Sequence, residues 1–322
     1  MTNAFIPIVT EDGSVTYYNK EFSDYYHSRH GAVREARELY VLTAMHFFEQ
    51  TFGHQHSEMT VLDACAGVGY NTFSFVEYWR QHRFSGMYDL RILMVDNDPK
   101  TAELMKTAAE NYKDMQQAAS NLFRHGTHTE IVQGTNGVRQ IFIKRMQADI
   151  RRFYSDEVFF RTIQNSWQFD AVFHDPFTPS RCPSLWCEEF FQSYQRCMKD
   201  NAILITYSNA VPVRAGLFAA GFKVKPSMCP GKKKSGITAY TAGSAKSDAL
   251  WEAVYLFTSG RLPYRRPEEN RPKAADETAG CIEQRKREIN DLLLKNPEIK
   301  KIKTYLKQYL KTAAAEKNPD RK

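Results

Sequence analysis

Residues 61–71 read VLDACAGVGYN, and residues 92–96 read ILMVD. Each apolar run predicts a buried strand, and the first leads into a loop that holds Gly67 and Gly69. Glycine lets the backbone approach a ligand closely, and the helix after such a loop presents its N-terminal amides to that ligand. Asp96, at the end of the second run, can accept hydrogen bonds from both hydroxyls of a ribose. The two runs therefore predict a site for a nucleoside-containing ligand at one edge of a parallel sheet.

The acidic residues of these runs separate the candidate ligands. A dinucleotide site normally carries a third glycine, which this loop lacks, and a carboxylate at Asp63 would repel a pyrophosphate. Asp63 suits a ligand with an ammonium group, and S-adenosylmethionine has an ammonium group, a ribose and no phosphate. On its own the glycine pair also fits a purely structural turn. Asp63 and Asp96 together favour the methyl donor.

Strand and helix patterns alternate along the chain, which predicts an α/β fold with an open, doubly wound, mostly parallel sheet of the Rossmann-like type. The predicted strands are 60–64, 91–96, 140–144, 169–173 and 202–207, and the predicted helices are 31–50, 70–80, 99–119, 185–198 and 212–220. A hairpin is expected within 10–30, an irregular excursion over 121–140, and a closing antiparallel pair within 222–257. Asp63, Asp96, Asp149 and Asp175 all follow strand ends, so we expect them to face one crevice.

We predict three parts: residues 1–50, a hairpin and helix that cover the site; residues 51–261, the methyltransferase domain; and residues 262–322, a basic, partly helical C-terminal extension. The chain has 322 residues and a net charge of +7. Residues 262–322 contain 16 Lys and Arg against 10 Asp and Glu, so most of the excess charge lies in this extension. Such an extension can attract a polyanion such as RNA, or it can be a solvated, partly helical tail.

No long apolar run predicts a membrane span, and no secretory signal is visible, so we expect a cytoplasmic protein. The six cysteines form no Cys-x-x-Cys pair and are expected to be reduced thiols. His54 and His56 alternate in a predicted loop, where solvated side chains are favoured over a metal site. No metal is therefore predicted, and the sequence leaves the oligomeric state open.

Residues 169–177 read FDAVFHDPF and form the second constellation. An apolar strand delivers Asp175 to the edge of the sheet, followed by Pro176 and Phe177. A polar residue, a proline and an aromatic at this point are typical of methyltransferases that act on amino groups. The polar group can hold the amine, and the ring can stack on a base. The alternative is a strand-ending turn with a hydrogen-bonded Asp.

The chain resembles the methyltransferase part of the bifunctional tRNA 5-methylaminomethyl-2-thiouridine biosynthesis (MnmC-type) proteins, in a form without the flavin oxidoreductase domain. The resemblance covers roughly residues 10–285. The matching segments are 12–16, 26–28, 31–36, 67–71, 149–151, 169–186, 206–208, 213–217, 220–222 and 263–265. Residues 175–186, DPFTPSRCPSLW, are the most specific of them. The chain departs from the family at Cys65, where a glycine is usual, at Asp200-Asn201, and in detail at 231–234.

This resemblance implies S-adenosylmethionine as cofactor and tRNA as partner. It implies N-methylation of the 5-aminomethyl group of (2-thio)uridine at the tRNA wobble position. Asp175 is the candidate catalytic residue, which accepts a hydrogen of the amine and aims its lone pair. The residues expected to bind the cofactor are Asp63 at the ammonium, Gly67 and Gly69 by close backbone approach, Asp96 at the ribose, Asp149 at the adenine amino group, and Glu35, Tyr26 and His27 from the resemblance alone.

The substrate would be an unstacked loop base, which needs aromatic stacking and phosphate-contacting cations. The candidates are Phe177, Trp186, Arg181, Arg214, Lys232, Lys233 and Lys234. Two other functions remain open at this point. The protein can be a class I methyltransferase for another amine, in a small molecule or a protein, or it can be a catalytically silent RNA-binding module.

Overall fold

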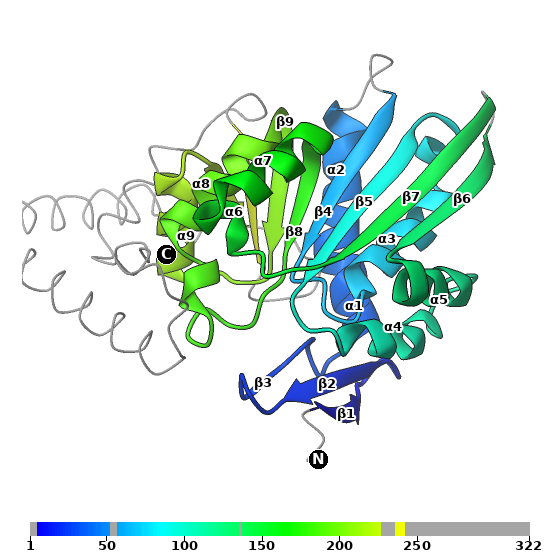
Figure 1. Cartoon of the computed structure of the whole chain (residues 1–322), viewed down its shortest axis with the longest axis horizontal. Helices are drawn as coiled ribbons and strands as arrows, with labels where there is room; N and C mark the ends of the chain where they lie inside the picture. The colour runs from blue at the N-terminus through cyan, green and yellow to red at the C-terminus, as the bar shows by residue number, and fades with distance from the viewer. Residues whose placement is uncertain (1–4, 52–56, 135–136, 227–235, 242–322) are drawn as a thin grey trace, which may run out of the picture.

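A central eight-stranded sheet organises the protein (Figure 1). The structure is a computed structural model that describes residues 5–51, 57–134, 137–226 and 236–241. The strand order is β10-β11-β9-β8-β4-β5-β7-β6. The parallel strands are β4 (Glu58–Ala64), β5 (Asp89–Asp96), β7 (Gly137–Gln147), β8 (Phe169–His174) and β9 (Met198–Thr206). The antiparallel ones are β6 (Thr127–Gly134), β10 (Lys223–Pro226) and β11 (Ile237–Tyr240).

Helices cover both faces of the sheet, so the fold has three layers (Figure 1). One face carries α1 (Ala32–Glu35), η1 (Ala36–Val41), α2 (Leu42–Thr51), α3 (Tyr70–Gln81), α4 (Thr101–Ala109) and α5 (Gln116–His125). The other carries α6 (Arg152–Ser155), α7 (Glu157–Ser166), α8 (Glu188–Cys197) and α9 (Val211–Ala219). The 3₁₀ turns are η2 (Arg83–Gly86) and η3 (Pro183–Leu185). Side chains alternate along a strand, so Val61 packs into one core and Leu62 into the other.

A second, three-stranded sheet lies across the carboxyl ends of the parallel strands (Figure 1). It consists of β1 (Phe5–Val9), β2 (Val15–Asn19) and β3 (Asp24–Tyr25). The turn between β1 and β2 also caps the helix that begins at α1. Asp12 Oδ2 accepts from the Arg34 amide at 2.9 Å, and Ser14 Oγ accepts from the Ala32 amide at 3.0 Å. These bonds satisfy helix N–H groups that have no partner within the helix, and they fasten the small sheet to that helix.

A wide turn interrupts the helix that follows. Residues 36–41 form a π-helix, η1, between α1 and α2. Tyr40 lies in this segment and is fully buried, and its hydroxyl meets the end of β8 through His174 and Asp175. π-helical turns of this kind frequently mark functional positions.

The predicted α/β class, the doubly wound parallel sheet and the closing antiparallel pair are confirmed. The predicted hairpin also exists, but its first strand begins at Phe5, before the predicted range of 10–30. The single helix predicted over 99–119 is wrong. The chain instead forms α4 and α5, because Asp114 adopts a left-handed backbone with φ of 61°. The excursion predicted over 121–140 is also wrong, since β6 and β7 pair antiparallel there. Helix α7 was not predicted, although Asp156 is an N-cap whose side chain accepts from the Phe159 amide.

Residues 5–50 and the sheet share one hydrophobic core, to which Phe5, Tyr40 and Phe48 contribute with Val61. The first predicted part therefore packs directly on the second. The predicted extension over 262–322 and the stretch 242–261 lie outside the described residues.

Candidate active site

A cavity of about 550 Å³ lies between the small sheet and the carboxyl ends of the parallel strands. Of the predicted site residues, the following line it: Tyr26, His27, Glu35, Gly67, Asp96, Asp149, Asp175 and Phe177. The cavity wall does not include Asp63, Gly69, Arg181, Trp186 or Arg214. Lys232, Lys233 and Lys234 lie outside the described residues. Of the four aspartates expected to face one crevice, Asp96, Asp149 and Asp175 therefore line it, and Asp63 does not.

The glycine loop is tied to the end of β5. The Gly67 amide donates to Asp96 Oδ2 at 2.9 Å, and the Asp98 amide donates to Oδ1 at 2.9 Å. Burial raises the pKa of Asp96, and the two amide hydrogen bonds partly oppose this rise. Tyr26 packs against Gly67 so closely that a Cβ there would lie 2.8 Å from the ring. Glycine is required here both by this contact and by the φ of 51°.

Cys65 lines the cavity in the same loop and adopts a left-handed backbone, with φ of 60°. This conformation is unfavourable for a residue with a Cβ, so the glycine usual in the resembling family would be accommodated with less strain. Burial raises the pKa of the Cys65 thiol well above its usual range. The thiol is therefore neutral at physiological pH.

Asp149 lines the cavity beside Arg151. Arg151 Nε donates to both carboxylate oxygens at 2.9 Å, and the Arg151 amide donates to Oδ1 at 2.9 Å. Burial opposes ionisation of Asp149, but the Arg151 hydrogen bonds and charge outweigh it and hold the pKa of this carboxyl low. Asp149 is thus an ionised hydrogen-bond acceptor in the cavity wall.

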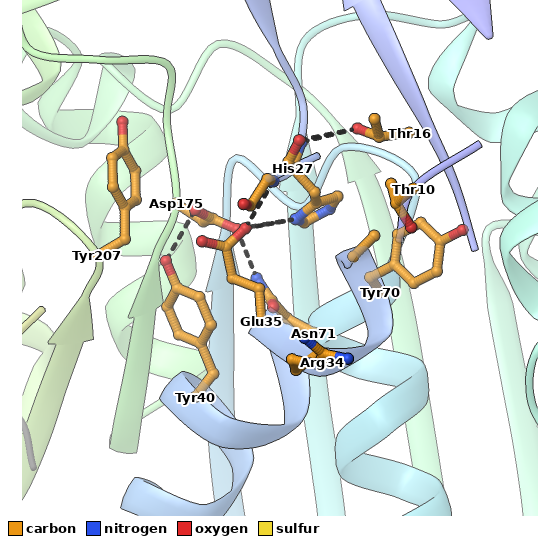
Figure 2. A network of polar contacts seen from close by, with 12 residues as sticks. Thr10, Thr16, His27, Arg34, Glu35, Tyr40, Tyr70, Asn71, Asp175 and Tyr207 are labelled. Carbon is orange, nitrogen blue, oxygen red and sulfur yellow. Dashed lines mark hydrogen bonds and ion pairs between the residues drawn. The ribbon is translucent and has the colours of Figure 1, made fainter. Parts of the chain in front are cut away.

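Asp175 is the centre of a polar network (Figure 2). Its Oδ1 accepts from the Tyr40 hydroxyl at 2.7 Å, and its Oδ2 accepts from Asn71 Nδ2 at 2.9 Å. Burial raises the pKa of Asp175 to about 6, against the effect of these two hydrogen bonds. The carboxylate is therefore largely ionised at neutral pH, and each of its oxygens is held by one donor.

His27 and Glu35 complete this corner (Figure 2). His27 Nδ1 lies 3.8 Å from Asp175 Oδ2 and 3.9 Å from Glu35 Oε2. Burial lowers the pKa of His27, although the charge of Glu35 opposes that shift, so the ring is neutral at physiological pH. Glu35 Oε2 accepts from the Ser28 amide at 2.9 Å. Two carboxylates thus face one end of the cavity across a neutral imidazole.

Aromatic rings form a wall beside Asp175. The rings of Phe177 and Phe22 stack with centroids 4.5 Å apart, and Tyr26 meets Phe177 edge-on at 5.0 Å. Trp186, expected at the substrate, is fully buried, and its indole N–H donates to the Phe177 carbonyl at 2.9 Å. In this conformation its burial rules out stacking on a base, and its contact supports the loop of Phe177. Arg181 is exposed, and Arg214 is half-buried on α9.

Asp63 also departs from its expected position. Its side chain is fully buried, since β4 is a central strand covered on both faces, and Oδ2 accepts from the Thr72 hydroxyl at 2.7 Å. Gly69 is the N-cap of α3 with φ of 92°, and a Cβ there would lie 3.0 Å from Phe73 and 3.3 Å from Met94. The sequence predicted the position of the loop correctly but did not indicate which of its side chains face the cavity.

Three polar residues of the site were not predicted to act there: Tyr40, Asn71 and Tyr207. Tyr207 lines the cavity, and its hydroxyl donates to the Pro176 carbonyl at 2.9 Å. Asn71 lay within the quoted loop, two residues after Gly69, and was an available signal. Tyr40 reaches Asp175 across 135 residues of sequence, and its helical spacing marked it only as a core residue.

The side chains around the cavity fit S-adenosylmethionine. Seven carboxylates line it against two arginines, one of which pairs with Asp149. This balance suits a ligand with ammonium and sulfonium charges and disfavours a pyrophosphate. Asp96 and Asp149 both line this cavity with carboxylate oxygens. The volume lies within the usual range for small-molecule sites, about 300–1,000 Å³.

Known proteins are similar to this chain in both sequence and fold. Residues 119–242 match a family described as S-adenosyl-L-methionine-dependent methyltransferase. An uncharacterized protein of Methanocaldococcus jannaschii is 26% identical, over 89% of this chain and 74% of its own length. The crystal structure of MNMC2 from Aquifex aeolicus matches with a TM-score of 0.64 and 20% identity, covering 86% of this chain and 84% of that one.

Bifunctional tRNA 5-methylaminomethyl-2-thiouridine biosynthesis proteins MnmC are also similar. That of Methylobacillus flagellatus is 26% identical over 67% of this chain, and that of Legionella pneumophila is 23% identical over 80%. The chain spans 32% and 41% of their lengths. The fold, the site and these matches define an S-adenosylmethionine-dependent methyltransferase. Over the matched residues the chain is similar to the MnmC relatives, at 23–26% identity.

The remaining expectations from the sequence concern membrane helices, metal clusters and the cysteines. No helix among the described residues is long and apolar enough to cross a membrane. The described residues include no cluster of three or more His, Cys, Asp or Glu suited to a metal ion. Cys65, Cys182, Cys187 and Cys197 are free thiols, whereas Cys229, Cys281, His54 and His56 lie outside the described part of the chain.

Proposed function

We propose that this protein methylates the primary amine of 5-aminomethyl-(2-thio)uridine at the wobble position of tRNA, giving 5-methylaminomethyl-(2-thio)uridine. The observation that carries the proposal is the Asp175 carboxylate, held by two donors at the edge of a cavity that suits S-adenosylmethionine. Phe177 beside it offers a ring for an unstacked base. The names of the MnmC relatives support the substrate. Such a substrate would place the protein in the cytoplasm.

We assign the cofactor-binding roles as follows. Gly67 permits close approach of the backbone, Asp96 accepts from the ribose hydroxyls, and Asp149 accepts from the adenine amino group. Glu35 takes the ammonium group, because it lines the cavity where Asp63 does not. Tyr26 closes the loop side of the site by packing on Gly67. The bound cofactor supplies an activated methyl group on a sulfonium.

Asp175 then aims the attacking amine. A free alkyl amine has a pKa of about 10, so freeing its lone pair at pH 7 costs about 4 kcal/mol. A nearby sulfonium lowers that cost by disfavouring a second positive charge. With a pKa of about 6, Asp175 is a weak base for the ammonium proton but an ionised acceptor for an amine hydrogen. In-line positioning would therefore provide most of the acceleration, and the proton would leave to water.

The test is methyl transfer from labelled S-adenosylmethionine into tRNA from cells that lack this final methylation, with nucleosides resolved by mass. We expect 5-aminomethyluridine to convert to its methylamino form. Asp175→Ala should abolish turnover while leaving the cofactor dissociation constant unchanged. Activity on free or protein amines with none on tRNA would overturn the substrate assignment. Binding of tRNA by wild-type protein without turnover would overturn the enzymatic one.

A further inference from the structure

The turn between β2 and β3 brings an aromatic side chain of the small sheet to the active site. Asn19 builds this turn, because its Oδ1 accepts from the Glu21 amide at 2.9 Å and from the Phe22 amide at 3.4 Å. Ser23 then adopts a left-handed backbone, with φ of 48°. An asparagine side chain that accepts from the backbone two residues on stabilises a turn. The turn therefore sets the position of Phe22, which lines the cavity.

Phe22 contacts a different part of the molecule from Phe5 and Tyr17, which lie in the same small sheet. Phe5 and Tyr17 belong to the hydrophobic core on the face of α1–α5. Phe22 instead packs against the core on the face of α6–α9, as Phe177 does. Phe22 thus reaches from the small sheet to the loop that follows β8.

The loop that carries Phe177 is held at its backbone. The Thr178 amide donates to Asp24 Oδ2 at 3.0 Å, which ties this loop to β3. The Phe177 carbonyl accepts from the Trp186 indole at 2.9 Å and from the Cys182 thiol at 2.8 Å. These bonds fix the main chain at Phe177 but leave the orientation of its ring to side-chain contacts.

Phe22 and Tyr26 set that orientation. Phe22 stacks on Phe177 with the ring planes 21° apart, and Tyr26 meets Phe177 with the planes at 64°. Stacked and edge-on pairs are both favourable arrangements of aromatic rings. The centroids of Phe22 and Phe177 are 4.5 Å apart, so no base fits between these two rings. The Phe177 ring is half-buried and lines the cavity, so a base can still reach the part of it that Phe22 does not cover.

We infer that Phe22 is a positioning residue for the substrate base. It covers one face of the Phe177 ring and holds that ring so that the base stacks on the other face. The inference rests on the proposed function, which places an unstacked base at Phe177. It gives the small sheet a part in substrate recognition, through Phe22, besides its contact with the glycine loop through Tyr26.

The test is a double-mutant cycle on methyl transfer to tRNA that lacks the final methylation. Phe177→Leu removes the stacking ring and should lower kcat/KM for tRNA about tenfold or more. Phe22→Leu leaves that ring unsupported and should lower kcat/KM about threefold to tenfold, through the KM for tRNA. In the double variant, Phe22→Leu should add less than about a twofold effect, because the ring that it positions is already absent.

Two control variants and one binding measurement separate positioning from a general effect on the fold. Phe22→Tyr keeps the stacked ring and should leave the KM for tRNA within about twofold of wild type. Phe5→Leu makes the same change in the small sheet, away from the cavity wall, and should also leave that KM within about twofold. The cofactor dissociation constant should be unchanged in every variant, which would show that the cavity is intact.

Independent, additive effects of Phe22→Leu and Phe177→Leu would show that Phe22 acts apart from Phe177 and would overturn the inference. A KM for tRNA that Phe22→Leu does not change, or a tenfold loss of cofactor affinity in that variant, would also overturn it. If wild-type protein does not methylate tRNA, the proposed function fails and the inference fails with it. If only the cycle fails, the proposed function stands.

Discussion

Replacing Asp175 with asparagine should make the protein more stable at neutral pH while abolishing methyl transfer. Burial raises the pKa of this carboxyl from 3.8 to about 6. Because the folded-state pKa lies above the unfolded one, the folded chain binds the proton more tightly. The stability that this tighter proton binding contributes is fully present below about pH 4 and is lost as the pH rises through about 6. Two pKa units correspond to about 3 kcal/mol of lost stability at pH 7.

Asparagine removes that ionisation cost but keeps a single oxygen, which can accept from Tyr40 or from Asn71 but not ideally from both. The lost hydrogen bond costs about 1–2 kcal/mol. The net gain at pH 7 is therefore about 1–2 kcal/mol, or about 3–6 °C in Tm for a domain of this size. At pH 4 the gain should vanish, and the variant should be the less stable protein.

The assay is thermal unfolding of wild-type and variant protein from pH 4 to pH 8, read as the difference in Tm at each pH. Taking the difference cancels every titration that the two proteins share. A second assay, on tRNA, should find the rate at least about a hundredfold lower. A Tm difference that does not change with pH would refute the burial argument, and a rate within threefold of wild type would refute the placement of Asp175 at the reaction.

Three further predictions follow from the site. Tyr40→Phe removes a hydrogen-bond donor to Asp175, so the pKa of Asp175 should rise further. The acidic limb of the pH–rate profile should then move to higher pH, and an unchanged limb would contradict the role of this hydroxyl. Gly67→Ala should raise the cofactor dissociation constant, measured by calorimetry, at least about tenfold, because the added Cβ would meet Tyr26. Gly13→Ala is the matched control and should leave cofactor binding unchanged, since Gly13 has a φ of 83° but a Cβ there would meet nothing within 4 Å. Cys65→Gly should raise the free energy of unfolding by about 1 kcal/mol in denaturant titrations, by relieving the left-handed backbone, and a loss of stability would show that thiol packing outweighs the strain.

Sequence reasoning worked best where short-range chemistry determines structure. The apolar runs, the glycine loop and the carboxylates after strand ends gave the sheet and the general position of the site. Asp96, Asp149 and Asp175 all line the cavity. Their common position has one physical cause, since the carboxyl ends of parallel strands meet at one edge of the sheet.

Sequence reasoning failed where the outcome depends on which way a side chain points or on distant contacts. Asp63 and Asp96 both lie at the ends of neighbouring strands, yet only Asp96 reaches the cavity. Trp186 matched a segment specific to the resembling family, yet its indole faces the backbone of Phe177. Tyr40 contacts Asp175 only because η1 brings it there, and no local pattern carried that information.

The wide turn at Ala36–Val41 makes the active site sensitive to the number of residues in one helix. A π-helical turn holds one residue more than an α-helical turn. Glu35 precedes this turn and Tyr40 lies within it, so the additional residue sets the angle between the two side chains around the helix axis. Each residue of an ordinary α-helix advances about 100° around that axis. Loss of a single residue here would turn Glu35 away from the cavity while the rest of the helix kept its packing. A relative with one residue fewer between Gly31 and Tyr40 would therefore need a different cofactor contact, even if every other site residue were the same.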